Sequence, residues 1–287
     1  MDSAETGIRN AGGKVRWLVV ALLLFAMVNN YIDRQMLGVL KPTLSHEMHW
    51  SEGDYANIVF WFQAAYALGY LVFGRIVDRV GARIGFTMAV IIWTLAHMAH
   101  GLARSAAQFM LARVALGIGE SGGFPASLKA VAEWFPQRER ALAIGIFNAG
   151  TNIGAVITPL IVPGLVLHYG WPAAFYVTGG FGLVWLLLWW ILYRRPEESK
   201  RVSASELNYI RQDGPDPSAR LGWFAVMRYK ETWAYAIAKF FIDPIWWFYL
   251  FWLPGYLFDR YHLDLLNFGL PIAAIYMISD LGSMGGG

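Results

Sequence analysis

Long apolar stretches alternate with short charged connections along most of the chain. A helix of about 20 apolar residues, rising about 1.5 Å per residue, spans the roughly 30 Å hydrocarbon layer of a bilayer. The pattern therefore predicts seven complete membrane helices, which we place at 17–40, 55–77, 84–103, 108–134, 140–167, 171–193 and 232–257. An eighth begins near Phe268 and is still apolar at Gly287, so we expect a fragment of a longer protein.

The composition agrees with this pattern. Of 287 residues, 57% are hydrophobic and only 15% are charged, which gives more apolar surface than one soluble core of that size needs. The chain has no cysteine, so disulfides and thiolate metal sites are excluded. His97 and His100 come closest to zinc-ligand spacing, but they lie in an apolar helix, and we expect neither a metal nor another cofactor.

Basic residues gather in alternate connections. The segments before the first helix, between the second and third, between the fourth and fifth, and after the sixth hold sixteen of the 23 Lys and Arg residues. Cytoplasmic loops carry such an excess, so the amino terminus is predicted to face the cytoplasm. The net charge of +3 reflects this asymmetry and gives no reason to expect a nucleic-acid partner.

A polar segment at 194–230 divides the apolar pattern. It contains three prolines, eight bases and five acids, and Ser203 followed by Glu206 predicts a short capped helix near 203–212. We expect an all-α membrane protein with three parts: a six-helix N-terminal bundle at 1–193, a cytoplasmic linker at 194–230, and a partial C-terminal bundle at 231–287. The last part would hold helix 7 and the start of helix 8.

Three of the predicted helices contain an acid and a base each: Asp33 and Arg34, Arg113 and Glu120, and Lys239 and Asp243. One charge at the centre of a membrane helix costs about 2.5–3.5 kcal/mol, so these side chains are expected to face one another, water or a ligand. They lie in the first, fourth and seventh helices, and we expect Asp33, Arg34 and Glu120 to converge on one wet cavity between two bundles. This spacing is typical of nested three-helix repeats, whose first helices supply binding residues.

Several motifs resemble one family of membrane carriers. Residues 74–83 (GRIVDRVGAR) resemble the loop signature of the major facilitator superfamily, and 113–120 (RVALGIGE) resembles its fourth-helix motif. Three further segments, 29–34 (NNYIDR), 119–125 (GESGGFP) and 133–140 (EWFPQRER), resemble the anion:cation symporter branch. Residues 239–254 (KFFIDPIWWFYLFWLP) are similar to bacterial hexuronate transporters. The resemblance implies a twelve-helix carrier fold, of which this chain covers about two thirds.

Adjacent helical side chains diverge by about 100°, so Asp33 and Arg34 need separate partners. A planar guanidinium suits a carboxylate, and we interpret Arg34 as binding the substrate carboxylate and Asp33 as accepting a proton. The alternative is that both only fix helix packing. The resemblance implies that Tyr31 and Tyr66 also line the substrate pocket.

Arg113 and Glu120 are seven residues apart, which places them on one helix face about 10 Å apart and not in direct contact. The resemblance implies that Glu120 takes part in proton coupling and that Arg113 tunes it. The alternative is that each pairs with another helix. Lys239 and Asp243 are spaced for a direct bridge, and Pro244 is expected to interrupt the helix that carries them.

Uncharged polar residues within the spans are further candidates. Gln63, Asn148 and Asn152 are suited either to recognition of substrate hydroxyls or to hydrogen bonds between helices. The aromatic run at 246–252 suits an interfacial belt or a helix contact, and sugar stacking by Trp247 is the alternative.

Two further groups of residues have predicted structural roles. The resemblance implies that Asp78, Arg79 and Arg83 act in gating, by holding the cytoplasmic side shut. Gly145, Gly150 and Gly154 are expected to permit close helix contact in the fifth span.

These features together predict a proton-coupled symporter that imports a sugar-acid anion, with a hexuronate such as galacturonate or glucuronate as cargo. We expect a monomer in the bacterial inner membrane. An enzyme is not expected, because no nucleophile, metal set or phosphate loop accompanies the charges. The alternatives are a carrier for another organic anion such as a hexonate, or a truncated membrane protein that does not transport.

Overall fold

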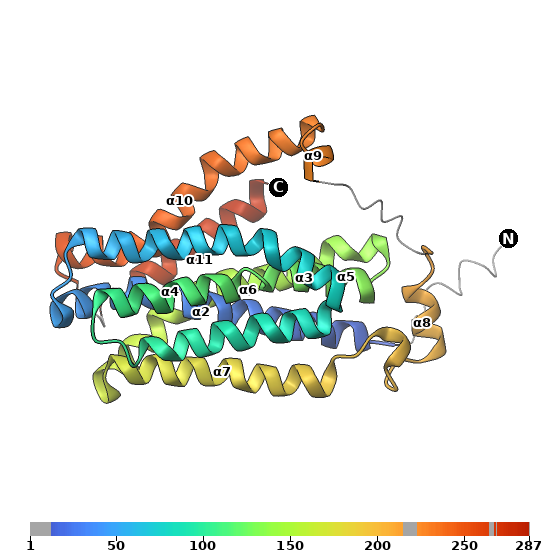
Figure 1. Ribbon diagram of the computed structural model, residues 1–287, viewed down its shortest axis with the longest axis horizontal. Helices are drawn as coiled ribbons and strands as arrows, with labels where there is room; N and C mark the ends of the chain where they lie inside the picture. The colour runs from blue at the N-terminus through green and yellow to red at the C-terminus, as the bar shows by residue number, and fades with distance from the viewer. Residues whose placement is uncertain (1–12, 215–222, 264–266, 268, 287) are drawn as a thin grey trace.

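The computed structural model describes residues 13–214, 223–263, 267 and 269–286, and every regular element among them is a helix. The bundle consists of long helices that run roughly parallel or antiparallel to its longest axis (Figure 1). The α-helices are α2 (Val15–Met48), α3 (Glu52–His100), α4 (Ala106–Glu120), α5 (Gly123–Trp134), α6 (Gln137–Tyr169), α7 (Trp171–Leu192), α8 (Ala204–Ile210), α9 (Trp223–Val226), α10 (Lys230–Tyr261) and α11 (Gly269–Gly286).

Five of the described helices are long and apolar enough to cross a membrane: α2, α3, α6, α7 and α10. They cover six of the seven predicted spans, because α3 contains two of them. The remaining predicted span corresponds to α4 and α5. Helix α11 occupies the predicted eighth, although Phe268 lies outside the described residues.

Helix α3 contains a sharp reversal at one glycine. Gly81 has φ +82° and ψ 167°, a backbone conformation that other residues rarely adopt, and the chain turns back there (Figure 1). A Cβ added at Gly85 would lie only 2.8 Å from Val77 Cγ2, so the two arms are in close contact at the turn. The predicted break between 77 and 84 is therefore confirmed as a turn at Gly81, although the helix continues almost to that glycine.

The predicted fourth span is also divided, because α4 ends at Glu120 and α5 begins at Gly123. The glycines here pack against other helices: a Cβ at Gly119 would lie 2.5 Å from the Trp93 nitrogen, and one at Gly122 would lie 2.6 Å from the Phe73 ring. The break places Glu120 at the carboxyl end of α4, next to α2.

Glycines also allow α6 to lie against α2. A Cβ at Gly150 would lie 2.6 Å from the Leu24 carbonyl oxygen, and one at Gly154 would lie 2.5 Å from that of Val28. No atom lies within 4 Å of a Cβ at Gly145. The expectation of close helix contact is thus confirmed for Gly150 and Gly154 and wrong for Gly145.

Helix α10 contacts the rest of the bundle at one end and diverges at the other (Figure 1). At the end where α2 finishes, the Tyr55 hydroxyl donates to the Phe251 carbonyl at 2.6 Å, and a Cβ at Gly38 would lie 2.5 Å from the Leu250 carbonyl oxygen. Toward the end where α2 begins, which we call the Val15 end, α10 leans away. The expected interruption at Pro244 is wrong, because α10 is continuous through it.

The described part of the linker lies at the Val15 end. Ser203 caps α8 as expected, since its hydroxyl accepts from the Glu206 backbone N–H at 3.2 Å. The buried Glu206 carboxylate accepts from the backbone N–H of Arg16 at 3.2 Å and from its guanidinium at 3.3 Å. A carboxylate at the amino end of α2 is favoured by the helix dipole. Residues 215–222 of the linker lie outside the described part, and the division into domains stays a prediction.

Candidate functional site

A cavity of about 380 Å³ lies between α10 and helices α2 to α5, near the middle of α2. Its walls come from α2, α3, the α4–α5 break and α10. The residues that line it are Met27, Asn30, Tyr31, Arg34, Tyr66, Tyr70, Glu120, Phe124, Tyr235, Lys239, Asp243, Trp246 and Trp247. Small-molecule sites have cavities of about 300–1,000 Å³ with a few convergent polar groups, so both the size and the lining suit a small ligand.

Arg34 and Glu120 form a buried ion pair in this cavity. The guanidinium donates from Nε at 2.8 Å and from Nη2 at 2.6 Å, and Glu120 Oε2 accepts both. The other carboxylate oxygen, Oε1, has no hydrogen-bond partner. Removing one member of a buried pair leaves an uncompensated charge, so either residue alone would be costly here.

Aromatic rings surround the Arg34 guanidinium from three helices. Its central carbon lies 5.0 Å from the ring centre of Tyr31, 4.6 Å from that of Tyr66 and 5.1 Å from that of Trp247. The ring of Phe62 lies at 5.4 Å. Ring faces attract a cation within about 6 Å, so they hold the guanidinium in place without neutralising it. Three of the expected pocket residues therefore meet at Arg34.

Lys239 and Asp243 form the expected bridge along α10, with Nζ 2.6 Å from Oδ1. Both line the cavity opposite Arg34 and are partly exposed. The charged residues in the described lining are thus two cations and two carboxylates. The cavity has no net charge when all four are ionised, so an anion that enters it adds uncompensated negative charge.

Arg113 is buried behind the cavity wall and does not line it. Its Nη2 donates to the backbone carbonyl of Arg34 at 3.3 Å, and its guanidinium lies 5.3 Å from the ring centre of Phe62. Both Arg113 and Glu120 therefore contact α2 at Arg34, one at the backbone and the other at the side chain. That Arg113 tunes the proton coupling of Glu120 stays a prediction.

Asp33 lies outside the cavity, contrary to the expectation that Asp33, Arg34 and Glu120 line the same cavity. It is fully buried, with its carboxylate 3.2 Å from His97 Nε2 and accepting from Asn29 Nδ2 at 3.3 Å. The 100° between adjacent helical residues explains the separation, because Arg34 already faces the cavity. Sequence reasoning considered His97 only as a metal ligand and missed this contact. The signal was present, since any ionisable residue in a membrane span needs a partner.

The uncharged candidates lie away from the cavity lining. Gln63 is half-buried on α3. On α6, Thr151 donates to the Asn148 carbonyl at 2.7 Å and to Asn152 Oδ1 at 3.4 Å. A role of these three residues in hydroxyl recognition stays a prediction. The described residues contain no group of three metal ligands.

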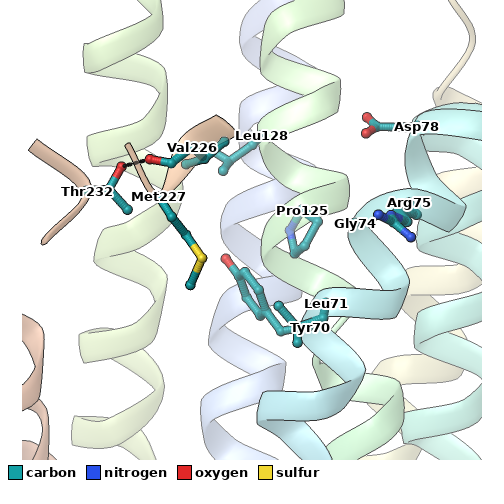
Figure 2. Close-up of a pocket in the computed structure, with 10 residues that line it drawn as sticks. All are labelled: Tyr70, Leu71, Gly74, Arg75, Asp78, Pro125, Leu128, Val226, Met227 and Thr232. Carbon is teal, nitrogen blue, oxygen red and sulfur yellow. Dashed lines mark hydrogen bonds between the residues drawn. The ribbon is translucent and has the colours of Figure 1, made fainter. Parts of the chain in front are cut away.

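A second cavity of about 660 Å³ lies between α3, α5, the end of α9 and the start of α10 (Figure 2). Mostly apolar side chains line it, and Tyr70 belongs to both cavities. Figure 2 shows the Tyr70 side chain directed toward Met227. The two cavities are therefore neighbours, and together they extend from Arg34 toward the Val15 end.

The expected gating residues lie around the Gly81 turn. Asp78 lines the second cavity, and both Asp78 and Arg79 are exposed in the helical turn before Gly81. Arg83 follows the turn, donates to the Trp190 carbonyl at 3.0 Å and stacks on the Trp190 ring at 4.4 Å. The cluster thus lies at the end where α10 diverges.

Comparison with known proteins bears on these observations. Residues 23–287 match the family model of the Major Facilitator Superfamily. The chain is 31% identical over 278 residues to a galacturonate transporter of Dickeya chrysanthemi, covering 95% of this chain and 81% of the relative. It is equally identical over 278 residues to two proteins of Escherichia coli (strain K12), a hexuronate transporter and a probable L-galactonate transporter. These alignments cover 95% and 94% of this chain, and it spans only 64% and 60% of the two relatives.

A solved structure shows the same fold. It is a bacterial homolog of the human lysosomal transporter Spinster, in an inward-facing and unoccupied conformation. The TM-score is 0.77 at 21% sequence identity, and the match covers 94% of this chain and 61% of that one.

Proposed function

Because this chain belongs to the Major Facilitator Superfamily and is a multi-pass membrane protein, we propose that it acts as a proton-coupled symporter importing a sugar-acid anion. A hexuronate such as galacturonate or glucuronate is the cargo, and the bacterial inner membrane is the location. The names of the galacturonate and hexuronate transporters that it resembles support this choice of cargo.

The observation that carries the proposal is the Arg34–Glu120 pair in the wall of the cavity. Glu120 occupies the guanidinium face that a carboxylate ligand would use, with Nε and Nη2 both directed at one oxygen. A proton on Glu120 weakens this contact and frees the two donors. The substrate carboxylate then replaces Glu120 on Arg34, in the bidentate geometry that guanidinium groups favour.

The charge balance of the cavity explains why binding of a proton and binding of an anion would favour each other. Arg34, Lys239, Glu120 and Asp243 sum to zero, so a monoanionic substrate alone would leave one negative charge at low dielectric. One proton on Glu120 restores neutrality. Proton and anion thus favour each other's binding. With one proton per monoanion no net charge moves, so the pH gradient drives uptake; a second proton would add about 2.3 kcal/mol per 100 mV of membrane potential.

The remaining cavity residues suit the sugar ring. Tyr31 and Tyr66 lie beside the guanidinium and present hydroxyl groups, and Trp247 offers an indole face. Lys239 supplies a second cation within the same space. We assign hydroxyl recognition to the tyrosines and ring stacking to Trp247.

The arrangement of α10 corresponds to one state of an alternating-access cycle. The contacts from Tyr55 and Gly38 close the end where α2 finishes, and the second cavity leads to the Val15 end. With the base-rich connections in the cytoplasm, this state opens inward. Rocking of α10 toward the Gly81 turn would close it, and Asp78, Arg79 and Arg83 are placed to hold it shut.

Counterflow tests the proposal directly. The purified protein in liposomes that hold unlabelled galacturonate should exchange it for labelled galacturonate outside, and Arg34→Ala should abolish the exchange. Arg34→Lys separates charge from geometry, since it keeps the cation but loses the fork. Wild-type liposomes that exchange no more than empty ones would refute galacturonate as the cargo.

A hexonate carrier is the second candidate, favoured by the similarity to the probable L-galactonate transporter. Arg34 recognises a carboxylate in either acid, so it does not distinguish them. Competition by unlabelled glucuronate, galactonate and gluconate against labelled galacturonate separates the two. Stronger competition by galactonate and gluconate than by glucuronate would assign the protein to the hexonate carriers.

A further inference from the structure

A second buried polar cluster lies on the side of α2 that faces away from the cavity. Asp33 and Asn29 of α2, His97 of α3 and Thr178 of α7 form it, and each has at most 1% of its surface exposed. His97 Nε2 lies 2.7 Å from the Thr178 hydroxyl and 3.2 Å from Asp33 Oδ1. None of the four lines the substrate cavity.

The hydrogen bonds define which nitrogen of His97 carries a proton. The Thr178 hydroxyl donates its only hydrogen to the Ala174 carbonyl at 2.8 Å, so its oxygen must accept from His97 Nε2. His97 Nε2 donates this N–H to Thr178, and Asp33 Oδ1, 3.2 Å from the same nitrogen, has no hydrogen-bond partner. The other ring nitrogen, Nδ1, is buried and has no hydrogen-bond partner.

Asn29 fits Asp33 in either charge state. Its amide nitrogen donates to Oδ2 of the carboxylate at 3.3 Å, and its amide oxygen has no partner. A carboxylic acid has a hydrogen to donate, which a rotated Asn29 amide would accept through that oxygen. The surroundings of Asp33 can therefore satisfy both its protonated and its ionised form.

We propose that His97 and Asp33 hold one coupling proton between them, so that His97 is the residue that positions and shares the proton of Asp33. The inference rests on the proposed symport. With the proton bound, the pair is neutral, either as a carboxylic acid beside neutral imidazole or as a carboxylate beside imidazolium. Release of the proton to water leaves neutral imidazole and a carboxylate, with one negative charge.

Charged groups on the neighbouring helices bear on both states. From α4, Glu120 and Arg113 both contact α2 at the neighbouring residue, Glu120 at the Arg34 guanidinium and Arg113 at the Arg34 carbonyl. From α3, His100 lies one turn from His97, and its Nδ1 contacts the Ala96 carbonyl at 2.8 Å and not Asp33. Helix α7 contributes the uncharged Thr178. Arg113 is thus the cation that stabilises the pair after the proton has left.

The position of the His97–Asp33 pair couples proton binding on one side of α2 to substrate binding on the other. Asp33 and Arg34 are neighbours in sequence but face different helices, so one movement of α2 alters both surroundings. When the substrate carboxylate displaces Glu120 from Arg34, the negative charge near Asp33 is rearranged as well. Proton release behind α2 and substrate release in front of it are therefore linked through one rigid helix.

His97→Gln tests the proposal, because glutamine keeps an N–H donor for Thr178 but binds no proton. We expect proton-driven accumulation of labelled galacturonate to fall about tenfold or more, since a charge moved with the potential contributes at least that much. Counterflow should continue at close to the wild-type rate. Asp33→Asn should give the same loss, and the double variant should be no worse than either single one.

His100→Gln is the matched control, since it removes a buried histidine one turn away that does not contact Asp33. It should accumulate galacturonate as the wild type does. Accumulation by His97→Gln at the wild-type level would overturn the proposal, and so would a loss of counterflow together with accumulation, which would indicate a structural role. A wild type that shows no proton-driven accumulation would instead contradict the proposed symport, and the inference with it.

A second measurement needs no change at His97. In protein labelled with ¹⁵N-histidine, Asp33→Asn should alter the ring-nitrogen signals of one histidine, because the neighbour that shares its proton is lost. Unaltered signals would show that Asp33 and His97 do not share a proton.

Discussion

The guanidinium of Arg34 directs two N–H donors at a single oxygen of Glu120 and leaves the other oxygen without a hydrogen-bond partner. A carboxylate held in this way is well placed to be exchanged, because a protonated Glu120 loses most of its attraction for Arg34. The donors it releases match those that a substrate carboxylate requires.

Removing the charge of Glu120 should uncouple transport from protons. In Glu120→Gln, Arg34 is permanently available, so galacturonate should bind equally well at about pH 5.5 and about pH 8, whereas wild-type affinity should fall as the pH rises. Calorimetric titration at both pH values measures this. Counterflow should persist while accumulation is lost.

The control for that variant is Glu47→Gln, which removes a carboxylate that accepts from Trp171 at 2.7 Å, far from the cavity lining. It should keep the pH dependence of the wild type. Retained proton-driven accumulation in Glu120→Gln would show that Glu120 does not couple transport to protons.

Replacing Arg34 should remove substrate binding. Arg34→Ala loses the bidentate contact and leaves Glu120 buried without a partner, a change worth about 3–5 kcal/mol in buried pairs. Galacturonate affinity should fall by about a hundredfold or more, because both charged donors to the substrate carboxylate are lost. Arg34→Lys should recover only part of this loss, and full recovery would mean that charge alone, without the fork, is recognised.

Close contact between α2 and α6 should depend on Gly154. A methyl group there would lie 2.5 Å from the Val28 carbonyl oxygen, so Gly154→Ala should lower stability by about 1–3 kcal/mol through overpacking. Gly145→Ala on the same helix meets no atom within 4 Å, and should be neutral or slightly stabilising. Thermal unfolding in detergent compares the two. Equal unfolding temperatures would mean that α6 shifts freely against α2.

The linker should be held to the bundle by Glu206. Glu206→Gln weakens the contacts to Arg16, which would then depend on Glu139 at 3.0 Å, and we expect a loss of about 1–3 kcal/mol. Hydrogen exchange of α8 should accelerate. Glu198→Gln, at an exposed position in the same linker, should leave the exchange of α8 unchanged. Unaltered exchange in Glu206→Gln would show that other contacts hold the linker.

Much of the fold is predictable from the sequence because the signals are local. Apolar length identified every span, and Ser203 with Glu206 identified the start of α8. The break after Glu120 was not located, since it depends on contacts between helices that no local pattern reveals. The interruption expected at Pro244 is also wrong, because α10 is helical through it.

The candidate site was predictable in its residues but not in its pairing. Their charge within a membrane span identified Arg34 and Glu120. Lys239 and Trp247 of α10 were further candidates from the sequence, and all four line the cavity. Which carboxylate binds which base depends on helix rotation. Asp33 was therefore expected in the cavity, although it lies behind α2 with His97.

Proton-driven accumulation tests the exchange of Glu120 for substrate at Arg34 most directly. Liposomes containing the protein, with an acidic exterior, should concentrate labelled galacturonate above its external level, and an uncoupler should return it to equilibrium. Accumulation that survives the uncoupler, or equilibration that ignores the pH gradient, would contradict proton coupling at this site.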